Sequence, residues 1–209
     1  MNPKTERIPA AARREQILAA ATTVFGEHGY AATTTDRVAR ASGISQPYVV
    51  RLFGTKEQLF VETLRHTLAR LLATFRGAIA GEGGPGAVGG AGDPGGDATS
   101  AEGRLGEAYL ALVEDRGVLL TLLHGFMMGS DPVVGPVARD GFLQVFRLLR
   151  DEAGFEPEQI HRFLADGMLI NTLLASGIGV AAKRDRDAAD LMDCTFGSHV
   201  ADVLERASA

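Results

Sequence analysis

The sequence contains one cysteine, Cys194, and has no overall basic charge, and each of these absences excludes a class of protein. A single cysteine can form neither a disulfide framework nor a CxxC metal pair within the chain, which is typical of a reducing cytoplasm. We interpret Cys194 as a small buried hydrophobic residue. The net charge of −5 argues against a protein that packages DNA non-specifically through a broad basic surface. We expect neither a cofactor nor a metal.

Long hydrophobic runs are also missing. The first residues, MNPKTERIPAAARRE, lack the apolar core of a signal peptide. The longest weakly polar run, MLINTLLASGIGVAA at 168–182, has 15 residues and includes Asn, Thr and Ser, whereas a membrane span needs about 20 apolar residues. We interpret this run as a buried helix and expect a cytoplasmic protein with no membrane partner.

Catalytic motifs are absent as well. The chain has five scattered histidines, and none lies in an HExxH or GxSxG context: His28, His66, His124, His161 and His199. The segment GEGGPGAVGGAGDPGGD at 81–97 is rich in glycine, but no GK[ST] follows it, which argues against a phosphate-binding loop. We therefore expect no catalytic residues and a protein that is not an enzyme.

Helical spacing dominates what is present, since no stretch alternates with period two for long enough to form a strand. Apolar residues at 17, 18, 21, 24 and 25 form one face of a first helix, which Gly29 follows. The run TTTD at 33–36 predicts the start of a second helix. Ser45 is expected to cap a third helix, which Gly54 ends.

Thr55, with Gln58 three residues later, forms a capping box for a long fourth helix. The glycine-rich segment that follows is expected to be a flexible loop over 81–98, either a hinge between domains or a tolerated surface insertion. Beyond it the pattern predicts five more helices, over about 101–115, 116–129, 131–153, 156–182 and 185–206.

The segment 35–53 meets the geometric demands of a helix-turn-helix, in which two helices join through a short turn that often holds glycine. Ala39 is the small residue where the helices approach, and Gly43 lies in the turn, where a positive φ costs it little. Four apolar residues are expected to hold the second helix against the first: Val38, Ile44, Val49 and Leu52. The side chains left off this packed face are Gln46, Pro47, Tyr48 and Arg51. Because recognition helices present such residues to base edges, the pattern predicts DNA binding, with ordinary helix packing as the alternative.

Phosphate ligands are expected on either side of this helix. Thr33, Thr34 and Thr35 begin one helix and Lys56 begins another, and helix starts offer free N–H groups to an anion. Residues 1–60 hold eight Lys or Arg against five Asp or Glu, a local charge of +3, whereas the remaining residues hold 13 against 21, a charge of −8. This asymmetry favours an anionic partner for the first segment.

Residues 14–60 resemble the N-terminal domain of the TetR family of bacterial transcriptional regulators. The resemblance is carried by the "ILAAA…F…GY..TT…VA..SGIS" run and the "F..KE.LF" tail. With the helix starts, it implies DNA contacts at or next to Thr34, Thr35, Ser45, Gln46, Pro47, Tyr48, Arg51 and Lys56. The sequence departs from the family pattern at two positions. The family often has Tyr at the position of Val50 and Gly or another small residue at the position of Pro47. Gln46 is suited to pair with adenine, and Arg51 with either guanine or phosphate.

The resemblance implies an all-α fold with a helix-turn-helix DNA-binding domain at 11–58, joined by the long helix to a helical regulatory and dimerisation domain at 59–209. It also implies a repressor that binds a palindromic operator as a dimer and is released by a small, largely apolar ligand. The ligand-binding candidates are Tyr109, His124, Phe126, Met127, Phe142, Phe146 and Asn171, for which the alternative is an ordinary core. The other functions considered are a ligand-independent regulator and a small-molecule-binding enzyme.

Dimerisation is expected through the last two helices, which have long apolar faces and would form a four-helix bundle with those of the second copy. Small residues that would allow close approach of the helices are Ala165, Gly167, Ala175 and Gly177. The alternative is that both faces are buried within one subunit.

Overall fold

The structure is a computed structural model that describes residues 9–81 and 100–196, and these ranges contain helices and no strand. The N-terminal helices are α1 (Ala10–Ala32), α2 (Thr35–Ser42), α3 (Gln46–Phe53) and the long α4 (Lys56–Ala80). The second half holds α5 (Ala101–Val113), α6 (Arg116–Met127), α7 (Val134–Arg147) with a π-helical turn η1 (Leu148–Glu152), α8 (Pro157–Ser176), α9 (Ile178–Ala181) and α10 (Arg186–Phe196). The predicted all-α fold class is confirmed.

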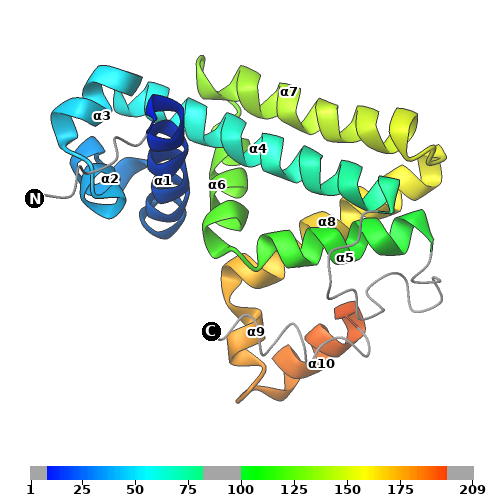
Figure 1. Ribbon diagram of the computed structural model, residues 1–209. Helices are drawn as coiled ribbons and strands as arrows, with labels where there is room; N and C mark the ends of the chain where they lie inside the picture. Colours follow the sequence, from blue (N-terminus) through cyan, green and yellow to red (C-terminus); the bar gives the residue numbers. More distant parts are fainter. Residues whose placement is uncertain (1–8, 82–99, 197–209) are drawn as a thin grey trace, which may run out of the picture.

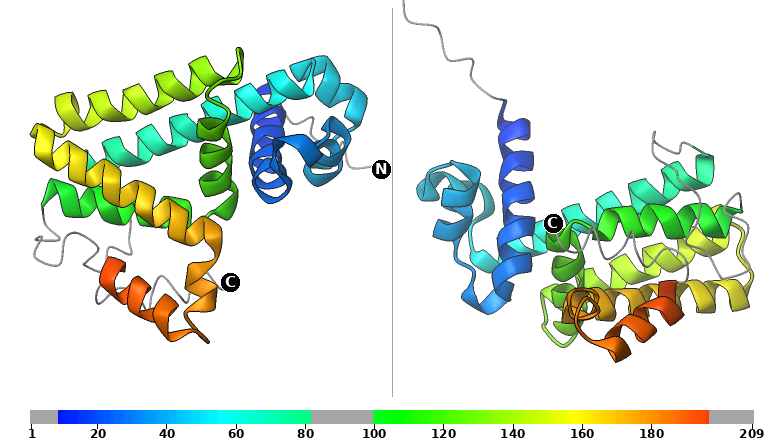
Figure 2. Two further views of the ribbon diagram at one scale, coloured as in Figure 1. Left: turned by 180° about the vertical axis from the view of Figure 1, so that it is seen from behind. Right: turned by 90° about the horizontal axis from the view of Figure 1, so that it is seen from below.

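The helices form a small N-terminal unit and a larger bundle (Figure 1). Helices α1–α3 lie together at one end, and α4 runs from that end through the length of the bundle. Helix α7 lies along one side of α4, α5 lies along another, and α6 stands across the molecule between α1 and the rest (Figures 1 and 2). This is the predicted helix-turn-helix domain joined by a long helix to a helical bundle.

An aromatic cluster holds α1 and α4 together. The ring centroids of Phe25 and Phe60 are 4.9 Å apart, and those of Tyr30 and Phe60 are 5.2 Å apart. Phe25 and Phe60 are fully buried, as are Ile17 and Leu18 on the same face of α1. Truncating a buried Phe to Ala typically costs about 3–5 kcal/mol. The cluster therefore contributes strongly to holding α1 against α4.

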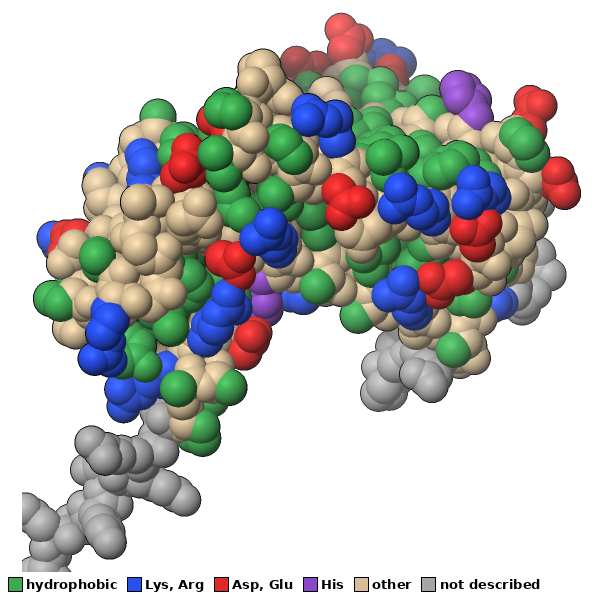
Figure 3. Space-filling model, turned by 90° about the horizontal axis from the view of Figure 1, so that it is seen from above, with side chains coloured by type: hydrophobic (Ala, Val, Ile, Leu, Met, Phe, Trp, Pro, Cys, Tyr) green, Lys and Arg blue, Asp and Glu red, His purple; other side chains and the backbone are tan. Residues whose placement is uncertain are grey.

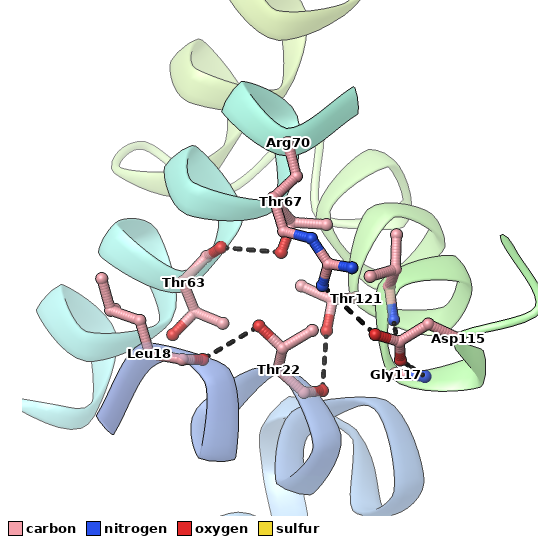
Figure 4. A network of polar contacts seen from close by, with 9 residues as sticks. Leu18, Thr22, Thr63, Thr67, Arg70, Asp115, Gly117 and Thr121 are labelled. Carbon is pink, nitrogen blue, oxygen red and sulfur yellow. Dashed lines mark hydrogen bonds and ion pairs between the residues drawn. The ribbon is translucent and has the colours of Figure 1, made fainter. Parts of the chain in front are cut away.

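Helices α1 and α6 cross at very short range, since a Cβ atom added to Gly26 would lie 2.7 Å from the Cα of Gly117. Buried hydroxyls reinforce the crossing (Figure 4): Thr121 donates to the backbone oxygen of Thr22 at 3.1 Å. At the start of α6, the Asp115 carboxylate accepts from the backbone N–H of Gly117 and also pairs with Arg70 of α4. The N-terminal unit is thus joined to the bundle through α6 as well as α4.

Three expectations about the second half need correction. The helix expected over 156–182 ends at Ser176, because Gly177 adopts the left-handed conformation with φ of +76° and separates α8 from α9. The helix expected from Asp131 begins at Val134, although the Asp131 carboxylate does accept from the N–H groups of residues 133 and 134. Cys194 is exposed, not buried. Apart from its first residue, Gly81, the loop predicted at 81–98 lies outside the described residues, as does the end of the last predicted helix.

Candidate nucleic-acid interface

Local capping interactions position the helix pair α2–α3. The Thr34 hydroxyl accepts from the N–H of Arg37 at 3.2 Å and begins α2. Gly43 ends α2 with φ of +67°, and the following N–H, of Ile44, donates to the carbonyl of Ala39 at 3.0 Å. This is the glycine-closed turn that the sequence predicts. Ser45 stands at the start of α3, but its side chain makes no capping hydrogen bond, which corrects one prediction.

Helix α3 packs through Val49 and Phe53, which are 0% and 7% exposed. They lie one helical turn apart and contact the same core as Val38 and Ala39 of α2. Leu52, expected in this packed set, is 38% exposed, so that prediction is wrong. Residues 49 and 53 are four positions apart and therefore lie on the same face of α3, which is the face that packs on the core. Leu52 lies outside this face.

The outward face of α3 is polar at its start and apolar further along. Gln46, Pro47, Val50 and Arg51 are all exposed. The Gln46 amide lies 3.4 Å from the hydroxyl of Thr35, a long contact that leaves the amide available to another partner. Val50, one turn after Gln46, is 39% exposed on the same face. The helix therefore offers an amide, a guanidinium and a methyl surface to solvent.

Tyr48 does not point freely outward, which corrects its expected place off the packed face. It is half-buried and packs against the core. The guanidinium carbon of Arg51 lies 4.7 Å from the Tyr48 ring centroid, and that of Arg13, on α1, lies 5.7 Å from it. The ring thus connects α3 to the first turns of α1.

Lys56 and the threonines at the start of α2 have partners within the protein. The Lys56 ammonium donates to the carbonyls of Tyr30 and Ala31 at 3.0 and 3.3 Å and lies 4.5 Å from the Tyr30 ring centroid. An ammonium has three N–H donors, so one remains. Thr33, expected among the exposed threonines, is fully buried and its hydroxyl donates to the carbonyl of Gly29, which corrects that prediction.

Unpaired cations gather on this unit. Arg14 pairs with Glu62, and Arg40 pairs with Asp36. Among the described residues, no carboxylate lies within ion-pair distance of the other arginines of α1–α3, which are Arg13, Arg37 and Arg51. Figure 3 shows several Lys and Arg side chains at the end of the molecule formed by these helices. Arg13 and Arg37 are missing from the sequence-based candidates, although the local charge of +3 pointed to this region.

The ligand-binding candidates fall into separate places. The Tyr109 hydroxyl donates to the side-chain oxygen of Asn171 at 2.7 Å, and burial raises the pKa of Tyr109 to about 12. The rings of Phe126 and Phe142 are 5.6 Å apart. Met127, in contrast, is 78% exposed.

The remaining two candidates contact other parts of the chain. His124 lies against Gly29 of α1, and burial lowers its pKa. The Phe146 ring lies under the guanidinium of Arg150, at 5.3 Å from its centroid. A surface groove of about 410 Å³ between α4 and α7 is lined by Leu68, Leu72 and Val137, and by none of the seven candidates.

A helix pair closed by glycine, an exposed second helix and unpaired arginines, all joined to a helical bundle, define the class of helix-turn-helix DNA-binding proteins. Residues 17–63 match the family model of the bacterial regulatory proteins of the tetR family. The N-terminal segment of the chain thus matches the TetR family, as the resemblance implied.

Known proteins that are similar to part of this chain are regulators of transcription by their names. The chain is 33% identical over 78 residues to the transcriptional activator FasR of Mycolicibacterium smegmatis, a match that covers 37% of this chain and 36% of that protein. It is 39% identical over 61 residues to the transcriptional repressor AcnR of Corynebacterium efficiens, covering 29% of this chain and 32% of that protein. The matches thus span about a third of the length of these relatives.

The whole fold is similar to that of a TetR-like transcriptional regulator from Rhodococcus sp. RHA1, with a TM-score of 0.57, 24% identity and 97% of each chain covered. The relatives named here are regulators of transcription by their names. Within the described ranges, no helix has the length and apolar character required to cross a membrane.

Proposed function

We propose that this protein is a transcriptional regulator of the bacterial cytoplasm that inserts α3 into the major groove of DNA. The observation that carries the proposal is the division of α3 into two faces. Val49 and Phe53 anchor the helix in the core, while Gln46, Val50 and Arg51 are left in solvent. A helix held in this way presents its N-terminal side chains to base edges.

The exposed side chains suit base reading. The Gln46 amide can donate to N7 and accept from N6 of an adenine, and its 3.4 Å contact with Thr35 is weak enough to exchange. The methyl groups of Val50 can contact the methyl group of a thymine. Arg51 can bind either a guanine or a phosphate, and its stacking on Tyr48 favours the phosphate.

The ends of neighbouring helices suit phosphate binding. Thr34 and Thr35 lie at the start of α2, and the Ser45 hydroxyl is not used for capping, so it is free to donate to a phosphate. Pro47 supports the first turn of α3 without needing an N–H partner. Lys56 has one N–H left at the start of α4. Such contacts orient the protein on DNA without reading its sequence.

We further propose that two copies bind a palindromic operator, because one recognition helix reads only a few base pairs. Part of the apolar face of α10 is used within the subunit, where Met192 and Phe196 pack against Leu173 of α8. Another side of α8 is left open, with Met168 and Leu169 37% and 44% exposed. This side, with the exposed part of α10, is the proposed dimer contact.

A charge placed on that face tests the dimer. Leu169→Glu should give a monomer in sedimentation velocity, and it should weaken DNA binding because the two recognition helices are no longer linked. Met127→Glu is the matched control, since Met127 is 78% exposed on α6 and should leave the dimer intact. A dimer that survives Leu169→Glu would refute this interface.

We propose that the protein is a repressor released by a small, largely apolar ligand near the half-buried Tyr109 and the buried Asn171. The pair offers an uncharged hydrogen-bonding group beside apolar rings, with Phe75 of α4 at 5.9 Å from Tyr109. A ligand can release DNA only if it prefers a dimer whose recognition helices no longer match the groove. Helix α4 would link the two sites, because Lys56 and Phe75 lie near its ends. A ligand-independent regulator would keep its DNA affinity against every apolar compound tested.

Selection of bound duplexes from a random pool tests DNA reading. The intact protein should enrich a palindrome whose half-sites lie about one helical turn apart, or a multiple of it. Gln46→Ala should relax the preference at one base position, whereas Lys56→Ala should weaken binding to all sequences alike. If no sequence is enriched, the proposed function is wrong.

A further inference from the structure

We propose that Arg13, on α1 and outside the helix-turn-helix, binds the DNA backbone, and that the ring of Tyr48 positions both Arg13 and Arg51 for this purpose. The inference rests on the proposed DNA-binding function and adds a phosphate site to it. The three residues are called the Arg–Tyr–Arg cluster below.

The cluster joins two helices around one aromatic ring. The guanidinium carbons lie 5.7 Å (Arg13) and 4.7 Å (Arg51) from the Tyr48 centroid, within the range of cation–π attraction. Tyr48 itself is half-buried and packed against the core, so its ring is a fixed platform. Both arginines are therefore held in place before DNA arrives, which lowers the entropy lost on binding.

Among the described residues, no carboxylate pairs with either arginine of the cluster. Arg14, the next residue along α1, pairs with Glu62 and stacks over Phe53. Arg13 has no such carboxylate among the described residues, and its Nε is buried without a hydrogen-bond acceptor. Two like charges thus share one ring, and no carboxylate in the described part of the chain forms an ion pair with either of them. An anion from outside would relieve this repulsion, and the phosphates of DNA supply it.

The spacing suits a nucleic-acid backbone. Because both guanidinium carbons are measured from one centroid, they can be no more than about 10 Å apart. Charges recur about every 3.4 Å of axis along one strand, so two guanidiniums at this separation can bind phosphates that are close together. Planar guanidinium groups also bind phosphate oxygens in pairs. The cluster lies beside the exposed face of α3, where the backbone flanking the groove would pass.

The test compares Arg13→Gln with Arg14→Gln, which remove the same charge from adjacent positions. Binding to a labelled duplex of random sequence is measured as salt rises from about 50 to 200 mM. The salt slope is the change in the logarithm of the binding constant with the logarithm of the salt concentration. Arg13→Gln should weaken binding several-fold and reduce the magnitude of this slope by about 0.9, the value for one lost phosphate contact. Arg14→Gln should leave the slope unchanged, because Arg14 is already neutralised by Glu62. An unchanged slope for Arg13→Gln would overturn the inference.

The role of Tyr48 is tested by separating its ring from its hydroxyl. Tyr48→Phe keeps the platform and should bind like the intact protein, whereas Tyr48→Leu should bind more weakly. Combined with Arg13→Gln, Tyr48→Leu should cost less than it does alone, since part of its effect acts through Arg13. Equal weakening by Tyr48→Phe and Tyr48→Leu would assign the contact to the hydroxyl and overturn the positioning role. Thermal unfolding of each variant confirms that it is folded.

The outcomes separate this inference from the function on which it rests. If the intact protein binds no duplex at all, the proposed function is wrong and the inference fails with it. If the intact protein binds and Lys56→Ala lowers the slope while Arg13→Gln does not, the inference alone fails.

Discussion

Replacing Gly26 by alanine measures how tightly α1 is fixed to α6. The added methyl carbon would lie 2.7 Å from the Cα of Gly117 and 3.0 Å from its carbonyl oxygen. Ordinary contact begins at 3.4 Å, so the helices must separate by about 0.7 Å, the difference between 3.4 and 2.7 Å. Overpacking of this kind costs about 1–3 kcal/mol, here toward the upper end because the obstructing atoms are backbone. The higher helix propensity of alanine relative to glycine stabilises the folded protein by roughly 1 kcal/mol and offsets part of this cost. The net expectation is a loss of about 1–2 kcal/mol.

Gly77→Ala is the matched control for this change. Gly77 also lies inside a helix, α4, but nothing lies within 4 Å of the position where its Cβ would be. Alanine there should stabilise the protein by about 0.5–1 kcal/mol. Urea unfolding followed by circular dichroism gives both free energies, with unchanged m values as the check on two-state behaviour. The reasoning is refuted if Gly26→Ala is as stable as the intact protein, because the crossing would then have room for a methyl group.

Two further predictions concern pH. Burial raises the pKa of Tyr109 from 10.0 to about 12, so its contribution to stability is complete below pH 10 and is lost as the pH rises toward 12. Between pH 10 and pH 12, urea unfolding should therefore show the intact protein losing about 1.4 kcal/mol per pH unit more than Tyr109→Phe, and parallel curves would contradict this. Burial lowers the pKa of His124 below 6.5, against the opposing hydrogen bond to the Phe25 backbone, so its contribution is present above pH 6.5 and is lost as the pH falls through the lowered pKa. His124→Gln should flatten the acid side of the melting-temperature profile, and an unchanged acid limb would show that another group is responsible.

Much of the N-terminal unit could be predicted because its signals are local. The apolar spacing of α1, a threonine cap for α2, and Gly43 and Gly54 at the helix ends act over three or four residues, and the structure confirms them, with Thr34 as the capping threonine. The same locality explains the confirmed start of α4, where the Thr55 hydroxyl accepts from the N–H of Gln58 at 3.1 Å.

Features that depend on contacts between helices could not be predicted in this way. The Tyr48 ring contacts Arg13, 35 positions earlier, and the carbonyls that accept from the Lys56 ammonium belong to the end of α1. Leu52 and Phe53 are both apolar neighbours, and only the rotation of α3 against the core decides which one is buried. The seven ligand candidates were selected by residue type. Residue type does not show whether side chains from different helices lie close enough to line one pocket.

The central claim is that the exposed face of α3 contacts DNA, and a site-directed cross-link tests it most directly. Because the chain has one cysteine, a Cys194→Ser background allows a photoreactive group to be attached at Val50→Cys, or at Val180→Cys on α9 as a control with 55% exposure of the native side chain. With a duplex from the selection, the account predicts a cross-link from position 50 and none from position 180. No cross-link from position 50, or equal yields from both positions, would contradict it.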